Sequence, residues 1–201
     1  GFSAGGMQHT LAAGVELMHE KQVTFGRGTA VAADTPAANL YHPDPTQTMF
    51  NFGPRNGSET GGTTNTIGVY VFDTAKLNEQ WSLNGGLRLD RYKLETDNLA
   101  LDGLRTELND SRNMVSWSVG GIYKPAQNGS IYASYATSET PPGANNFQLS
   151  AAEGNQANSA LDPQETSTVE LGTKWELLNK QLNVSAALFR NENDKQVSLD
   201  P

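Results

Sequence analysis

The ten residues Trp-Ser-Leu-Asn-Gly-Gly-Leu-Arg-Leu-Asp at 81–90 decide the fold, because their side chains alternate between two kinds. Trp, Leu, Gly, Leu and Leu stand at the odd positions, and Ser, Asn, Gly, Arg and Asp stand at the even positions. Successive side chains of a β-strand point to opposite faces of its sheet. The stretch therefore predicts a strand with one apolar face and one polar, charged face.

Further stretches of the chain alternate in the same way, at residues 10–17, 66–71, 115–123, 130–138, 168–177 and 182–191. No convincing amphipathic helix lies between them. We predict an all-β protein, an antiparallel up-and-down meander of about seven strands. The alternation often continues for about nine residues or more, which is the length that a tilted strand needs to cross a bilayer.

The connections between these predicted strands alternate strictly between long and short. Long connections are predicted at 25–62, 94–112 and 139–164, and short ones near 74–79, 125–129 and 179–180. All long loops therefore leave one end of the sheet and all tight turns leave the other. This sorting is typical of an outer-membrane barrel, and a soluble β-sandwich has no reason to adopt it. Long loops in a compact protein are usually functional.

Three aromatic side chains, Trp81, Tyr123 and Trp175, fall on the apolar face near the tight turns. Such positions are typical of the aromatic belt at a membrane interface. Phe72 and Tyr132 lie at the same depth but have the opposite parity. These aromatic residues could also fill the core of a sandwich. The pattern alone favours part of a transmembrane barrel and leaves the sandwich open.

Composition excludes several classes of protein. The 201 residues carry a formal net charge of −8 and contain no Cys. The negative charge argues against a nucleic-acid partner, since binding to phosphates depends on Lys and Arg. The absence of Cys excludes disulfide scaffolds and Cys-ligated zinc. No apolar run is long enough for a transmembrane helix. The N-terminus shows no signal peptide, so we expect either a cytosolic chain or a mature or excised piece.

Six short stretches follow one another in the last 80 or so residues: Gly-Gly-Ile-Tyr-Lys-Pro (120–125), Ser-Ile-Tyr-Ala-Ser-Tyr-Ala-Thr-Ser (130–138), Pro-Pro-Gly (141–143), Leu-Asp-Pro-Gln-Glu-Thr (161–166), Val-Glu-Leu-Gly-Thr-Lys-Trp (169–175) and Leu-Asn-Val-Ser-Ala-Ala-Leu-Phe-Arg (182–190). In their order and spacing they resemble TonB-dependent siderophore receptors. In that family a strand ending in Tyr-x-Pro is followed by a Tyr-Ala-Ser-Tyr strand and a loop that contains Pro. Residues 68–73 and 81–90 are similar to mid-barrel strands of the same family. The stretch 137–143 is most similar to the catecholate subgroup.

The resemblance implies a partial architecture. Members of the family have a barrel of about 22 strands closed by an N-terminal plug domain, which carries the segment that binds TonB. We expect residues 1–201 to be an interior segment of such a barrel, without the plug and the TonB-binding segment. An open sheet has two unpaired edges and a lipid-facing surface, so we expect the isolated chain to aggregate or to need detergent.

The resemblance also implies a function and a set of partners. We expect a receptor in the outer membrane of a Gram-negative bacterium that takes up a ferric siderophore without enzymatic activity. Its partners would be the ferric siderophore, outer-membrane lipid and the TonB complex, which it would reach through the plug. Iron would enter only as part of the ligand, and no resident cofactor or metal is expected.

A ferric chelate is anionic and often aromatic, so Arg near Tyr or Phe is the expected recognition chemistry. The predicted long loops offer these residues as ligand contacts: Arg27, Tyr41, Phe50, Phe52, Arg55, Arg105, Asn145, Asn146 and Phe147. Arg112, in the same predicted loop as Arg105, is a further expected ligand contact. We expect Arg55 to form part of a chelate contact with Phe50 and Phe52. Alternatively, the two Phe side chains only pack the loop onto itself.

Catalytic constellations are absent from the sequence, which has neither a Gly-x-Ser-x-Gly elbow nor a Walker loop. Gly26-Arg27-Gly28 lacks the third Gly of a dinucleotide site. An outer-membrane enzyme is therefore disfavoured. The remaining alternative is a secreted all-β module that binds carbohydrate, with Trp81, Trp117 and Trp175 as stacking platforms. All three Trp residues share the apolar face of their strands, which favours the receptor segment.

Overall fold

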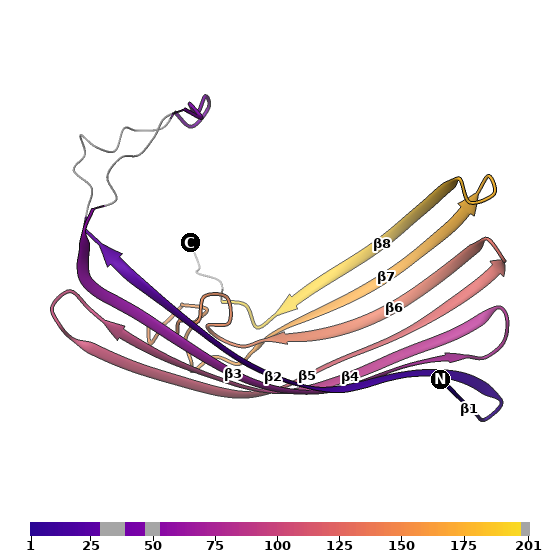
Figure 1. The fold of residues 1–201 in the computed structure, drawn as a ribbon, viewed down its shortest axis with the longest axis horizontal. Helices are drawn as coiled ribbons and strands as arrows, with labels where there is room; N and C mark the ends of the chain where they lie inside the picture. Colours follow the sequence, from indigo (N-terminus) through magenta and orange to yellow (C-terminus); the bar gives the residue numbers. More distant parts are fainter. Residues whose placement is uncertain (29–38, 47–52, 198–201) are drawn as a thin grey trace.

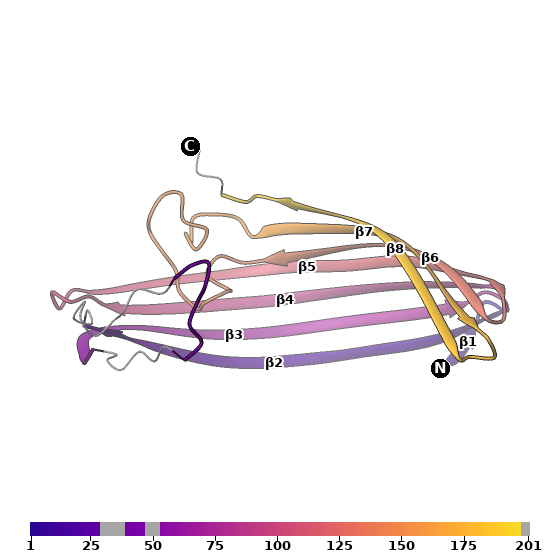
Figure 2. The same cartoon turned by 90° about the horizontal axis from the view of Figure 1, so that it is seen from above.

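The computed structural model describes residues 1–28, 39–46 and 53–197. Within these residues the chain forms one eight-stranded sheet whose strands follow one another in sequence order. Every neighbouring pair is antiparallel. The strands are β1 (Phe2–Ala4), β2 (Met7–Arg27), β3 (Arg55–Lys76), β4 (Trp81–Leu99), β5 (Arg105–Ala126), β6 (Gly129–Thr140), β7 (Gln164–Leu177) and β8 (Leu182–Asp194). The sheet is strongly curved, as Figures 1 and 2 show, and forms a trough with a convex and a concave side.

The predicted antiparallel meander is confirmed. Each of the predicted strands lies within one of β2 to β8, and β1 is an additional short strand that pairs with the start of β2. The described residues contain a single sheet, without a second sheet to face it, so the sandwich is excluded. They also contain no helix that is long and apolar enough to span a membrane.

The predicted long loop at 94–112 is wrong. Strand β4 continues to Leu99 and β5 begins at Arg105, so that only residues 100–104 connect them. The prediction failed because the parity of the alternation changes beyond Leu89. Apolar side chains then stand at even positions, as in Tyr92 and Leu94, and charged ones at odd positions. The pattern that starts at Trp81 therefore breaks off although the strand continues.

The other predicted connections are confirmed, and the two long ones are shorter than predicted. Residues 28–54 and 141–163 leave one end of the sheet together with 100–104, and we call this the long-loop end. Short turns join the strands at the opposite, short-turn end, at residues 5–6, 77–80, 127–128 and 178–181. Three successive residues of the last turn, from Leu178 to Lys180, have positive φ angles.

The two faces of the sheet differ in what covers them. Odd-numbered side chains of β2 to β5 lie on the convex face, where large apolar residues such as Val69 and Val119 remain about half exposed. Even-numbered side chains lie on the concave face, over which residues 141–163 fold back (Figure 1). Trp81 stacks on Tyr123 of the neighbouring strand on the convex face, at 4.6 Å between ring centroids. Tyr132, of opposite parity, instead hydrogen-bonds to Glu170.

The largest buried cluster of the described residues is small and lies on the concave face near the long-loop end. Tyr92, Leu94, Met114 and Leu149 form it, and Leu108 and Phe147 pack against it. Three of the buried residues come from β4 and β5, and Leu149 comes from the segment 141–163. This cluster therefore attaches the long connection to the wall of the sheet.

Candidate ligand-recognition face at the long-loop end

Residues 141–163 cross the concave face because β3 and β4 provide a place for their backbone. A Cβ atom at Gly62 would lie 1.9 Å from the Phe147 carbonyl oxygen, so only glycine permits this close approach. Thr96 of β4 accepts a hydrogen bond from the Leu149 amide at 3.0 Å and donates one to the Phe147 carbonyl at 3.4 Å. The segment is thus bound to the wall at its backbone as well as through the buried cluster.

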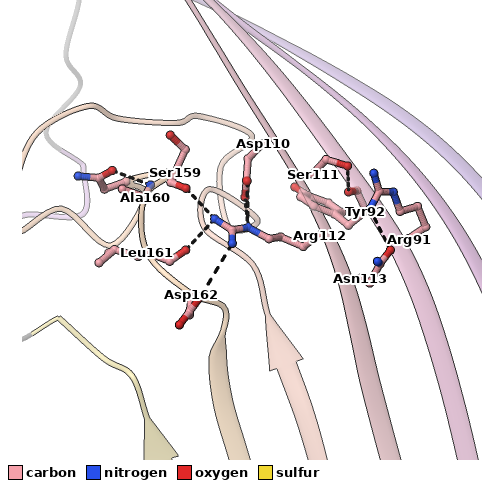
Figure 3. Close-up of polar contacts among 11 residues, drawn as sticks. Arg91, Tyr92, Asp110, Ser111, Arg112, Asn113, Ser159, Ala160, Leu161 and Asp162 are labelled. Atoms are coloured by element: carbon pink, nitrogen blue, oxygen red, sulfur yellow. Dashed lines mark hydrogen bonds and ion pairs between the residues drawn. The ribbon is translucent and has the colours of Figure 1, made fainter.

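Arg112 of β5 holds the far part of the same segment (Figure 3). Its guanidinium group donates hydrogen bonds to the carbonyl oxygens of Ser159 at 2.6 Å and Leu161 at 2.9 Å. It also pairs with the buried carboxylate of Asp110 at 2.9 Å and approaches Asp162 at 4.0 Å. A planar guanidinium with several donors can make all these contacts at once, which a Lys ammonium cannot reproduce. Arg112 therefore positions the loop, and its Nε and Nη2 donors are already used.

Asn145 and Asn146 lie on this folded segment and are exposed. They line a hollow of about 240 Å³ whose other walls include Gln164, Asp162 and Lys195. Lys195 forms an ion pair with Glu165 at 2.5 Å, and this hydrogen bond raises the pKa of Lys195. Most of the polar side chains that line the hollow carry amide groups: Asn145, Asn146, Asn155, Gln156 and Gln164.

Phe147, the third predicted contact in this segment, has a different place. Its φ angle is positive, at 55°, and its ring packs against the buried cluster. The structure therefore gives Phe147 a role in anchoring the loop, whereas Asn145 and Asn146 remain open to solvent.

The predicted arginine contacts lie elsewhere, around the tips of the long strands. Arg27 donates to the Gly53 carbonyl at 3.2 Å, and the guanidinium carbon of Arg55 lies 3.7 Å from the centre of the Phe25 ring. Arg105, expected in a loop, is the first residue of β5 and pairs with Asp97 at 3.3 Å. Tyr41 is 85% exposed. Phe50 and Phe52 lie outside the described residues.

The structure thus separates the predicted contacts into two groups. Asn145, Asn146 and Phe147 belong to the concave side, and Arg27, Arg55 and Arg105 lie at or near the strand tips. Arg105 lines a different hollow, of about 470 Å³, together with the acidic residues Glu59, Asp97 and Glu107. These carboxylates oppose an anionic ligand there. Of the two groups, the concave one has the surroundings that suit a neutral or anionic ligand better.

Ion pairs on the concave face use most of its charge. Arg88, lower on the same face, pairs with Glu16 at 2.7 Å and Asp90 at 2.8 Å. Arg112 is occupied by Asp110 and by two carbonyl groups, as described above. Both arginines of the wall are therefore held in ion pairs with carboxylates. Within the described ranges, no group of His, Cys, Asp and Glu side chains could hold a metal ion.

Sequence reasoning missed the part that Asp110, Tyr92 and Leu94 play at this face. The change in the parity of the apolar residues could have identified them, because these three residues stand on the face opposite the exposed apolar side chains of the same strands. Arg112 was considered as a ligand contact, but its hydrogen bonds go to the loop backbone.

Comparison with known proteins identifies the family. Residues 2–201 match the family described as TonB dependent receptor-like, beta-barrel. The chain belongs to the TonB-dependent receptor β-barrel family. The catecholate siderophore receptor Fiu of Escherichia coli O6:H1 is 36% identical over 98% of this chain. The probable TonB-dependent siderophore receptor PiuA of Acinetobacter baumannii is 32% identical over 100% of it.

A solved structure of the same family has the same arrangement of strands. The closed form of the ferric-catecholate import receptor Fiu from E. coli K12 superimposes with a TM-score of 0.82, at 33% identity over 97% of this chain. The chain spans 28% of the length of the E. coli O6:H1 receptor and 29% of PiuA. Both relatives are named as siderophore receptors, which is the class of protein that the sequence predicts for this segment.

Proposed function

We propose that this chain forms part of the barrel wall of an outer-membrane receptor for TonB-dependent uptake of a ferric catecholate siderophore in a Gram-negative bacterium. The observation that supports it most directly is the 36% identity to a catecholate siderophore receptor across nearly the whole chain. The sorting of long loops and short turns to opposite ends fits the extracellular and periplasmic sides of such a barrel.

The concave face contributes the ligand-facing surface of the receptor. Asn145 and Asn146 offer amide donors to the oxygen atoms of the chelate, and Arg27 and Arg55 add positive charge near the rim. Aromatic surface comes from three residues of the connection 28–54, namely Tyr41, Phe50 and Phe52. Arg105 supports the tip of its strand, and Phe147 supports the folded loop. Iron enters as cargo within the chelate, and the segment has no enzymatic role.

Partners follow from the same proposal. The convex face contacts outer-membrane lipid, since its exposed leucines and valines need an apolar covering. Energy reaches the receptor from the TonB complex through a plug domain that closes the barrel. No nucleic acid takes part, because the net charge of −8 repels phosphates.

The test is uptake of iron by the complete receptor that contains this segment. The receptor is produced in a strain that lacks its own catecholate receptors, and uptake of ⁵⁵Fe bound to a catecholate siderophore is measured. Uptake is expected in cells with TonB and not in cells without it. Uptake of a ferric hydroxamate in place of the catecholate would contradict the substrate class, and uptake that persists without TonB would contradict the mechanism.

Asn145→Ala tests the proposed contact, with Asn109→Ala as its matched control on the convex face. Loss of one hydrogen bond of about 1 kcal/mol predicts that the Asn145 variant binds the chelate about fivefold more weakly. The control is exposed to a similar degree but faces away from the hollow, so it should bind normally. Equal affinities of both variants, measured by quenching of protein fluorescence, would remove Asn145 from the binding surface.

A further inference from the structure

The dipeptide Asn-Gly occurs three times in the chain, and the structure places each copy in different surroundings. The copies are Asn56-Gly57, Asn84-Gly85 and Asn128-Gly129. In such a dipeptide the glycine nitrogen can attack the side-chain amide carbon of the asparagine, since glycine has no Cβ atom to hinder the approach and its backbone rotates freely. The backbone pairing and the hydrogen bonds around each copy therefore decide whether the attack takes place.

Two of the copies are held by their neighbours. Asn84-Gly85 lies inside β4, and both residues have register partners in β3 and in β5. Asn128 lies in the turn before β6, and its side-chain amide donates a hydrogen bond to the Glu176 carbonyl at 3.0 Å. Gly129 is buried beneath the Trp175 ring, since a Cβ atom there would clash with carbons of that ring. Local unfolding would have to precede a reaction at either copy.

The third copy lies in a bulge at the tip of β3, formed by residues 56–58. Only Gly26 of β2 lies opposite these three residues, because the register between β2 and β3 shifts there. The register with β4 begins only at Glu59. Gly57 has a positive φ angle of 96°, and both it and Asn56 are exposed. The backbone of this copy thus lies outside the paired ladder, where extra residues of a bulge are left without a register partner.

The side chain of Asn56 is folded back over the bulge and is polarised there. Its Oδ1 atom accepts hydrogen bonds from the Ser58 amide at 3.0 Å and from the Ser58 hydroxyl at 2.8 Å. Its Nδ2 atom donates to the Arg27 carbonyl at 3.1 Å. Two donors on one carbonyl oxygen withdraw electrons from its carbon, and they are already in place to stabilise an oxyanion. The amide carbon of Asn56 is therefore activated beside the exposed Gly57.

We propose that Asn56 is a site of spontaneous deamidation, in which the Gly57 nitrogen displaces ammonia from the side chain. Water removes the proton from the Gly57 nitrogen, which forms a bond to the Asn56 amide carbon, and the negative charge on Oδ1 faces the two donors of Ser58. The bond between that carbon and Nδ2 then breaks, and Nδ2 takes up a proton and leaves as ammonia. A second water molecule opens the resulting cyclic imide and leaves an aspartate or an isoaspartate at position 56.

The product changes the strand tip that carries two of the predicted arginine contacts. It places a carboxylate next to Arg55, and it replaces the donor that Asn56 gives to the Arg27 carbonyl by an oxygen atom. An isoaspartate also adds a methylene group to the backbone of the bulge. The effect on ligand binding rests on the proposed function: the new negative charge opposes an anionic chelate at this tip.

The test follows the three Asn-Gly copies in the complete receptor, kept in detergent at mildly alkaline pH in water enriched in ¹⁸O. Mass spectrometry of the peptides detects each conversion, because a hydroxyl group that carries the heavy oxygen replaces the amino group. Asn56 should convert about tenfold faster than Asn84 and Asn128, since the sheet and the turn must open before those two can react. Asn128 is the matched control, because residues 56–58 and 128–130 are both Asn-Gly-Ser. In denaturant these two copies should convert at equal rates.

Variants of the bulge test the part that Ser58 plays. Ser58→Ala removes the hydroxyl donor and should slow the conversion of Asn56 about fivefold, whereas Ser58→Thr keeps the donor and should keep the rate. Equal rates of Asn56 and Asn128 in the folded receptor would overturn the proposal. A difference between them that persists in denaturant, or an unchanged rate in Ser58→Ala, would overturn it as well.

Binding of the ferric catecholate by aged samples reports on the consequence for the ligand separately from the mass measurement. The aged receptor should bind the chelate more weakly than the fresh receptor. Asn56→Gln should bind equally well before and after ageing, because its longer side chain would have to close a larger ring. Equal loss in the receptor and in Asn56→Gln would contradict the effect of position 56 on the ligand.

Discussion

Two leucines of β4 show how differently the two faces of the sheet are covered. Leu89 on the convex face is 49% exposed, whereas Leu94, five residues farther along the same strand, is 0% exposed. Both belong to one continuous strand and have the same hydrophobicity. The difference arises because residues 141–163 lie over Leu94, while no part of the described chain lies over Leu89.

This contrast implies that the two faces depend on different partners for their stability. The concave cluster is completed by the chain itself, through Leu149, Thr96 and the hydrogen bonds of Arg112. The convex leucines and valines require a covering from outside the chain, which the proposed membrane supplies. A substitution on the concave face should therefore loosen residues 141–163, whereas a substitution on the convex face should change stability in a membrane.

Arg112→Met is expected to have the largest effect of the substitutions that test this contrast. It leaves the buried Asp110 carboxylate without its cation and two loop carbonyls without a donor. Breaking a buried pair in this way costs about 3–5 kcal/mol, so residues 141–163 should leave the concave face. Limited proteolysis of the complete receptor should then cut within 151–160.

The exposed pair of Arg105 with Asp97 provides the control, since Arg105→Met should cost at most about 1 kcal/mol. Equal cutting in both variants would contradict the anchoring role of Arg112.

Leu94→Ala should have a somewhat smaller effect on the same loop. Truncation of a fully buried leucine removes apolar contacts and leaves a cavity, at a cost of about 2–5 kcal/mol. Leu89→Ala is the matched control on the convex face, and it should not change the protease sensitivity of 141–163. Hydrogen exchange of the Leu149 amide, which bonds to Thr96, measures the loosening directly. If Leu89→Ala increased this exchange as much as Leu94→Ala, the separation of the two faces would be wrong.

Val69→Arg and Asn65→Arg test the convex face at two depths of β3. Val69 lies within the apolar face and Asn65 lies just beyond its boundary. Arginine near the middle of a bilayer costs about 2–4 kcal/mol, and near the interface at most about 1 kcal/mol. Reversible unfolding of the complete receptor in lipid vesicles should show this difference. Equal effects at both positions would mean that the apolar face does not lie in the bilayer.

Much of this architecture could be predicted from periodicity. The alternation in 81–90 and its counterparts identified the strands, and the sorting of connections identified the two ends. The alternation failed at 94–112, because a strand whose surroundings change halfway also changes the parity of its apolar residues. The expected contacts Asn145 and Asn146 do face a hollow, whereas Arg105 and Phe147 have structural partners that no local pattern reveals.

The sequence by itself determined which face of each strand is apolar, because the parity of side chains along a strand is a local property. It also indicated most of the connections, through Gly, Pro and Asn residues, but not the short one at 100–104. Only the tertiary structure decided that residues 141–163 fold inward, since this depends on the meeting of Gly62 with Phe147 and of Arg112 with Ser159 and Leu161. Those pairs are far apart in the chain, and the curvature of the sheet is what brings them within contact distance.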